Sequence, residues 1–211
     1  MNIFKTIKED LTEPDALHAL KLVWKSYSFW LLAGAFAGWV YCACAPAVTQ
    51  TLSGAVILWL FSTLLAAIAI ADAKTYVVPD ALLYPLAILA LVTMPQNIFF
   101  MGLGALLLGA MFLLVKVGVE KVLKQQALGW GDIKLVTVLG LWLGVTGIVP
   151  FLLLSSLVAV LVVLVMRLLK RGEIYVPFAP FLVFGGWLAY PYGDIINAWL
   201  IALRMTLLGG F

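Results

Sequence analysis

The sequence has few charged residues, one histidine and two cysteines. Charged residues make up 11% of the 211 residues, whereas hydrophobic residues make up 65%. Water-soluble domains carry about 25% charged and about 45–50% apolar residues, so an ordinary soluble fold and a disordered chain are excluded. The formal net charge of +3 is also too small and too dispersed for a nucleic-acid-binding protein. The composition therefore indicates an integral membrane protein.

The cysteines and the histidine do not predict a cofactor or metal site. Cys42 and Cys44 are one residue apart in an apolar run, unlike the CxxC pairs of zinc sites, so they indicate neither a metal nor a redox compartment. We interpret His18 as an interfacial residue near the polar edge of a weakly amphipathic segment. Residues 1–20 lack the apolar core and cleavage site of a signal peptide. We expect a cytoplasmic or interfacial segment at 1–25 and a membrane-embedded domain at 26–211.

Long uncharged runs predict a bundle of membrane helices. These runs cover residues 26–71, 81–115, 135–166 and 174–193. One membrane span needs about 20 apolar residues, so each of the first three runs holds two helices. The fourth run holds one helix, which a turn at 190–194 separates from a short last helix. The sequence thus predicts an all-α polytopic membrane bundle of about eight spans; the short segments 81–94 and 135–148 leave six or seven as alternative counts.

The basic residues predict how this bundle is oriented. With the N-terminus inside and the helices alternating, all 13 Lys and Arg residues fall on the cytoplasmic side or within about one turn of it. Asp194 is then the charge that remains outside. Both termini are therefore expected in the cytoplasm.

Two aspartates lie at predicted helix ends that face the same side of the membrane. Asp72 ends the second predicted helix, and Asp132 opens the fifth. Two facing carboxyl groups can share a proton, so that one acts as a base on water while the other protonates a carbonyl oxygen or a leaving amine. This chemistry of an aspartic protease needs no metal and no nucleophilic serine or cysteine.

Structural roles remain open for the same residues. Asp132 could cap a helix N-terminus, Asp80 after Pro79 could do the same, and Asp72 could be a solvated boundary residue. Gly129 and Gly131 around Trp130 favour a functional role, because they allow the close backbone approach that an extended peptide requires. The helix dipoles predict a lowered pKa for Asp132 and place the shared proton on Asp72.

These motifs resemble the signature of a known family. Asp72-x6-Pro79-Asp80, together with Gly129-Trp130-Gly131-Asp132-Ile133-Lys134-Leu135, resembles the bacterial type IV prepilin peptidases, which are GxGD intramembrane aspartyl proteases. The resemblance extends over residues 50–205. It implies that Asp72 and Asp132 are the catalytic pair, supported by Pro79, Asp80, Gly129, Trp130, Gly131 and Lys134.

The resemblance also implies a substrate and a location. The family cleaves the basic leader of type IV prepilin or pseudopilin precursors at the cytoplasmic face of the bacterial inner membrane. Expected partners are these precursors, the lipid bilayer and other components of a pilus or secretion assembly, but not nucleic acid. Long members carry two CxxC pairs associated with N-methylation. Because this sequence has no CxxC, we expect a short form without N-methyltransferase activity.

A transporter is the competing interpretation. Asp72 and Asp132 would then bind a cation or relay protons, because carboxylates within membrane proteins are commonly functional. Such groups usually lie near the bilayer midplane between inverted repeats. Here both aspartates lie at the predicted membrane boundary, and no repeat is visible. A purely structural membrane subunit would leave the GxGD motif unexplained.

Overall fold

The computed structural model describes residues 52–93, 97–124, 128–169 and 177–208. This part of the chain is helical, which confirms the all-α prediction. Its helices, in chain order, are α4 (Leu52–Thr75), α5 (Asp80–Thr93), α6 (Ile98–Leu123), α7 (Trp130–Leu143), α8 (Ile148–Leu168) and α9 (Ala179–Leu208). The interpretations of His18, Cys42 and Cys44, the domain boundary at residue 25 and the first predicted helix concern residues outside the described ranges.

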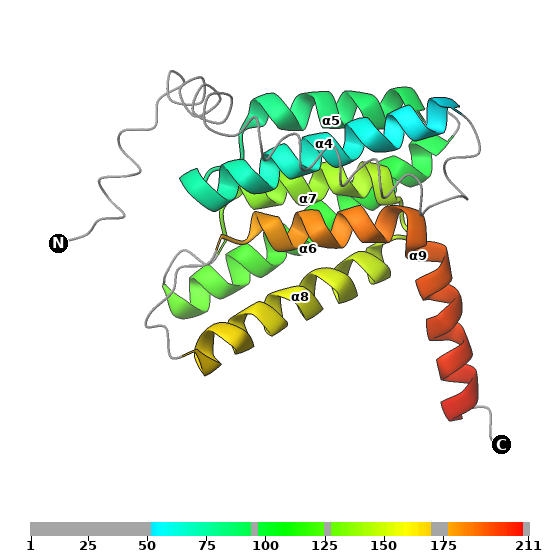
Figure 1. Ribbon diagram of the computed structural model, residues 1–211. Helices are drawn as coiled ribbons and strands as arrows, with labels where there is room; N and C mark the ends of the chain where they lie inside the picture. The colour runs from blue at the N-terminus through cyan, green and yellow to red at the C-terminus, as the bar shows by residue number, and fades with distance from the viewer. Residues whose placement is uncertain (1–51, 94–96, 125–127, 170–176, 209–211) are drawn as a thin grey trace.

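The helices form a bundle in which α4 to α8 and the first part of α9 run side by side (Figure 1). Successive helices reverse direction, so the C-terminal ends of α4, α6 and α8 lie at the same end as the N-terminal ends of α5, α7 and α9. The segments that carry both motifs therefore converge at this end. We call it the motif end of the bundle.

Within the described ranges, three helices are long and apolar enough to cross a membrane: Ser53–Thr75, Ile98–Val122 and Ile148–Leu168. Helices α5 and α7 have 14 residues each. At 1.5 Å per residue, each of these spans only about 21 Å of a hydrocarbon core of about 30 Å. The structure thus supports a membrane protein with three clear spans and leaves the prediction of about eight spans unconfirmed.

The predicted turn at 190–194 is wrong, because α9 is one helix of 30 residues that contains Pro191. Proline removes one backbone hydrogen bond and bends a helix without always ending it. Figure 1 shows that α9 bends and that its last part leaves the bundle. Asn197 in this last part donates a hydrogen bond from Nδ2 to the Thr146 carbonyl at 2.9 Å.

One cluster of the core is built from large apolar and aromatic side chains. Phe61 of α4 packs on Trp142 of α7 with ring centroids 4.4 Å apart, and Tyr190 of α9 lies 5.2 Å from both rings. Trp142 Nε1 donates a hydrogen bond to the Leu86 carbonyl of α5 at 3.0 Å. This cluster joins four helices and fixes α4 relative to α7.

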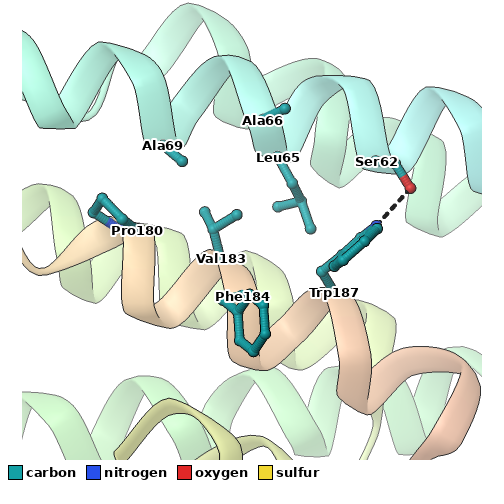
Figure 2. A pocket seen from close by; sticks show the side chains of 8 residues that line it. All are labelled: Ser62, Leu65, Ala66, Ala69, Pro180, Val183, Phe184 and Trp187. Atoms are coloured by element: carbon teal, nitrogen blue, oxygen red, sulfur yellow. Dashed lines mark hydrogen bonds between the residues drawn. The ribbon is translucent and has the colours of Figure 1, made fainter. Parts of the chain in front are cut away.

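An apolar hollow separates parts of α4 and α9. Its volume is about 250 Å³, and it is lined by Ser62, Leu65, Ala66, Ala69, Pro180, Val183, Phe184 and Trp187 (Figure 2). Trp187 Nε1 donates a hydrogen bond to Ser62 Oγ at 2.8 Å, across one end of the hollow. This bond links the interior of α4 to that of α9.

Candidate active site

Asp72 lies in the last turn of α4 and is only 5% exposed. The helix ends at Thr75, and the next residue, Tyr76, adopts a left-handed conformation with φ of 54°. The Tyr76 N–H donates a hydrogen bond to the Asp72 carbonyl at 2.8 Å and closes the helix end. For a non-glycine residue this conformation costs about 1–2 kcal/mol of conformational free energy, and it turns the chain abruptly just after Asp72.

The Asp72 carboxylate is positioned by a helix distant in the sequence. The Ala179 N–H donates a hydrogen bond to Asp72 Oδ2 at 3.1 Å. Ala179 begins α9, and the first N–H groups of a helix have no partner within it and carry partial positive charge. This donor stabilises negative charge on the buried Asp72 carboxylate.

Asp132 is the third residue of α7. The residue before the helix is Gly129, in extended conformation with φ of −69°, and its N–H donates a hydrogen bond to the Asp132 carboxylate. A side chain at the third helical position that accepts from the N-cap N–H forms one half of a capping box. Asp132 therefore caps the N-terminus of α7, as the structural interpretation expected, although Gly129 and not Asp132 occupies the N-cap position.

The two glycines of the motif allow close approach rather than an unusual backbone conformation. A Cβ atom on Gly131 would lie 2.9 Å from Cβ of Val78, in the segment after Asp72. A Cβ atom on Gly129 would lie 3.1 Å from Asp132 Oδ2. Larger residues would therefore separate the two motifs or displace the Asp132 carboxylate.

The pKa of Asp132, at the start of the short helix α7, is raised to about 6. Burial is the largest cause, and the nearby charge of Asp72 acts in the same direction. The Gly129 N–H and the positive charge of Lys116 lower this pKa, but by less. The expected lowering at a helix N-terminus is therefore wrong, because burial and a like charge outweigh the helix end.

Asp72 and Asp132 line the same cavity, which has a volume of about 360 Å³. The cavity brings together every site residue predicted from the sequence, namely Asp72, Pro79, Asp80, Gly129, Trp130, Gly131, Asp132 and Lys134. Tyr76, Val77 and Val78 complete its lining. Trp130 is 62% exposed, so its ring is accessible to a ligand at the cavity.

Lys134 and Asp80 form an ion pair at the edge of this cavity. Lys134 Nζ lies 2.9 Å from Asp80 Oδ1 and 2.7 Å from Oδ2, and both side chains are about half exposed. Helix α5 begins at Asp80, so the pair connects the start of α5 to the first turns of α7.

Two contributors to the site were not predicted. Ala179 acts through its backbone N–H, which no side-chain pattern reveals. Lys116 of α6 is buried, and its Nζ donates hydrogen bonds to Glu120 Oε1 and to the Leu128 carbonyl. The sequence signal for Lys116 is a lysine that follows a long uncharged run and lies one helical turn before a glutamate.

The arrangement suits general acid–base catalysis. Two carboxyl groups in different surroundings can take opposite roles, one as acid and the other as base. Within the ranges that the structure describes, no three His, Cys, Asp or Glu side chains are grouped so that they could hold a metal ion.

Comparisons with known proteins agree on one family. Residues 58–164 match the model of the type IV leader peptidase family. A "Prepilin leader peptidase/N-methyltransferase" from Xanthomonas campestris pv. campestris is 32% identical over 154 residues, which is 70% of this chain and 53% of the relative. A protein with the same name from Pseudomonas aeruginosa is 33% identical over 63% of this chain and 48% of that relative. Another, from Bacillus subtilis, is 32% identical over 69% of this chain and 59% of that relative.

The chain spans about half the length of the curated relatives that it matches. No solved structure matches it.

Proposed function

The chain belongs to the type IV leader peptidase family, and from this premise we propose that it is a membrane-embedded aspartic endopeptidase. Its proposed substrates are type IV prepilin or pseudopilin precursors, from which it removes the basic leader. The observation that carries the proposal is the cavity shared by Asp72 and Asp132. The relatives' names also include an N-methyltransferase; for this chain we propose the peptidase activity alone.

We propose that the motif end of the bundle faces the cytoplasm. Most basic residues in the described ranges lie at this end, namely Lys74, Lys116, Lys121, Lys124, Lys134 and Arg167. Lysine and arginine concentrate on the cytoplasmic side of membrane proteins, here the bacterial inner membrane. A leader cleaved on that side would meet the cavity directly.

Asp72 is the proposed base. Its carboxylate accepts a hydrogen bond from the Ala179 N–H, and this bond stabilises the negative charge that a base needs to accept a proton from water. Asp132, with its raised pKa, is the proposed acid and carries the shared proton. This assignment reverses the one expected from helix dipoles alone.

The proposed reaction has two steps. In the first, the water oxygen attacks the carbonyl carbon of the peptide, Asp72 accepts a proton from that water, and Asp132 gives its proton to the carbonyl oxygen. In the second, the C–N bond breaks as Asp72 passes its proton to the leaving amine, and one hydroxyl of the intermediate returns a proton to Asp132. Both carboxyl groups recover their starting states, so the cycle needs no other reactant.

The test uses Asp72→Asn and Asp132→Asn with a purified precursor that carries a basic leader, a glycine and an apolar helix. Each variant should lose cleavage by about 10²-fold or more, because each removes one acid–base group. Asp194→Asn is the matched control, since Asp194 is exposed and lies beyond Tyr190, away from the motif end. Near wild-type cleavage by both variants, with the proteins still folded in the membrane, would disprove the assignment of the pair.

A further inference from the structure

The ammonium group of Lys116 is buried, and the mechanism above does not use it. Lys116 is 5% exposed and lies in α6, where the preceding residues from Ile98 onward are uncharged. A buried charge is unfavourable unless ion pairs and hydrogen bonds compensate for the lost water. The partners of Lys116 therefore indicate what keeps it there.

These partners belong largely to the segment that begins α7. Lys116 Nζ donates hydrogen bonds to Glu120 Oε1 at 2.7 Å, on its own helix, and to the Leu128 carbonyl at 2.5 Å. It also lies 5.2 Å from the centroid of the Trp130 ring, within the range of a cation–π interaction. One ammonium group thus contacts the residues on both sides of Gly129.

The segment held by Lys116 also holds Asp132. Gly129, between Leu128 and Trp130, donates its N–H to the Asp132 carboxylate. The positive charge of Lys116 favours the same carboxylate, against burial and the charge of Asp72. Lys116 therefore acts on Asp132 both through the backbone and through its charge.

We propose that Lys116 is a positioning residue of the dyad, which fixes the segment 128–130 at the start of α7 and stabilises the Asp132 carboxylate after proton transfer. This inference rests on the proposed function, in which Asp132 gives its proton to the substrate oxygen. At that moment a carboxylate forms in a half-buried site, and Lys116 supplies the nearby positive charge.

Several other charged or titratable groups face Asp132. Asp72 faces it from α4, and Glu120 accompanies Lys116 on α6. The remaining ones line the same cavity, namely Tyr76, Asp80 and Lys134. When the charge of Lys116 is removed, burial and Asp72 still raise the pKa of Asp132, and the Gly129 N–H alone of the causes named above still lowers it. This pKa should therefore rise further.

The decisive experiment measures the protonation of Asp132 directly. Infrared spectra of the Asp72→Asn protein are recorded as a function of pH. The carboxyl band of Asp132 is identified as the band that disappears when Asp132→Asn is added to this protein. Adding Lys116→Met or Lys116→Gln should move the midpoint of this band to higher pH by about one unit. Lys116→Arg, which keeps the charge, should leave the midpoint near that of the parent.

Lys121→Met is the matched control, because it removes the same charge from an exposed position on α6. It should not move the midpoint. The inference is overturned if both Lys116→Met and Lys116→Gln titrate like the parent, or if Lys121→Met shifts the midpoint equally. Should Lys116→Met fail to accumulate, Lys116→Gln, which retains hydrogen-bond donors, decides the question.

Kinetics with the precursor provide the second measurement. In otherwise wild-type protein, Lys116→Met should lower kcat by about tenfold and change KM less, because it misplaces an acid rather than a binding group. The alkaline limb of the pH profile, where Asp132 loses the shared proton, should move to higher pH. The infrared titration uses an inactive background, so absence of cleavage by the wild type would reject the proposed function without deciding this inference.

Discussion

At the scale of single residues, the Lys134–Asp80 ion pair gives two residues of the motifs a contact with each other. Lys134 contacts both carboxylate oxygens of Asp80 at the cavity edge. Both side chains are about half exposed, so water screens the attraction, and such pairs typically stabilise by about 0–1 kcal/mol. We interpret the pair as a brace between α5 and α7.

This interpretation predicts mild effects. Asp80→Asn and Lys134→Met should each lower kcat/KM by less than about tenfold, since loss of a screened pair costs at most about 1 kcal/mol. The double variant should behave like either single variant, because the same contact is lost in all three. Initial rates of precursor cleavage by the wild type, the two single variants and the double variant complete this double-mutant cycle. A loss in Asp80→Asn as large as that in Asp72→Asn would instead make Asp80 part of the acid–base machinery.

The residues of the cavity show which part of the site was predictable. Asp72 and Asp132 stood out because they lie at predicted helix ends that face the same side of the membrane, and the neighbouring glycines and Pro79 marked the same two segments. The contribution of Ala179 could not be predicted, since it comes from a backbone N–H that is 107 residues from Asp72 in the chain. The raised pKa of Asp132 was missed because burial is a property of the folded site, not of the helix end.

At the scale of helices, the close contact between α6 and α7 sets the position of Asp132. A Cβ atom on Gly140 would lie 2.6 Å from Cα of Ala105 and 2.7 Å from the Gly104 carbonyl oxygen, so the two backbones almost touch. Backbone atoms cannot move aside as a flexible side chain can. Gly140 lies on the same helix as Asp132, and any widening of this contact would displace the carboxylate.

Gly140→Ala should therefore destabilise the protein by about 1–3 kcal/mol through overpacking and lower its cleavage rate. Gly102→Ala is the matched control, because Gly102 is an exposed residue of α6 with nothing within 4 Å of an added Cβ. It should be neutral or stabilise by up to about 1 kcal/mol, since alanine favours a helix over glycine. Thermal unfolding in detergent compares the two variants. Equal unfolding midpoints would show that the contact is not tight.

The helices also show where sequence patterns fail. We expected turns at 94–97 and near 144–150, because both segments contain glycine or proline with polar residues. Helices lie on both sides of each segment, but α8 begins at Ile148, so Pro150 belongs to this helix and the turn expected near 144–150 was too long. The same reasoning placed a turn at 190–194, but α9 continues through Pro191. Neighbouring helices can support a proline within a membrane helix, so a proline alone does not separate a bend from an end.

At the scale of the whole molecule, the alternation of the helices decides whether the two motifs can meet. Asp72 ends α4 and Asp132 begins α7, and the helices α5 and α6 lie between them in the chain. Two intervening helices that reverse direction return the chain to the starting end of the bundle. The shared cavity thus depends on an even number of helices between the motifs.

This arrangement predicts the accessibility of both ends of the bundle. The labelling uses protein in which Cys42 and Cys44 are replaced by serine, and a thiol reagent that does not cross the membrane. Lys124→Cys at the motif end should react only after the cells are permeabilised, so that the reagent reaches the cytoplasm. Asp194→Cys should react in intact cells, because exposed Asp194 lies on α9 beyond Tyr190, which packs on Trp142 away from the motif end. A mass-tagged maleimide reports both positions by gel shift, and cleavage of a precursor in the same cells verifies that each variant is folded. Labelling of Lys124→Cys from outside in active protein would place the cavity on the wrong side of the membrane for a cytoplasmic leader.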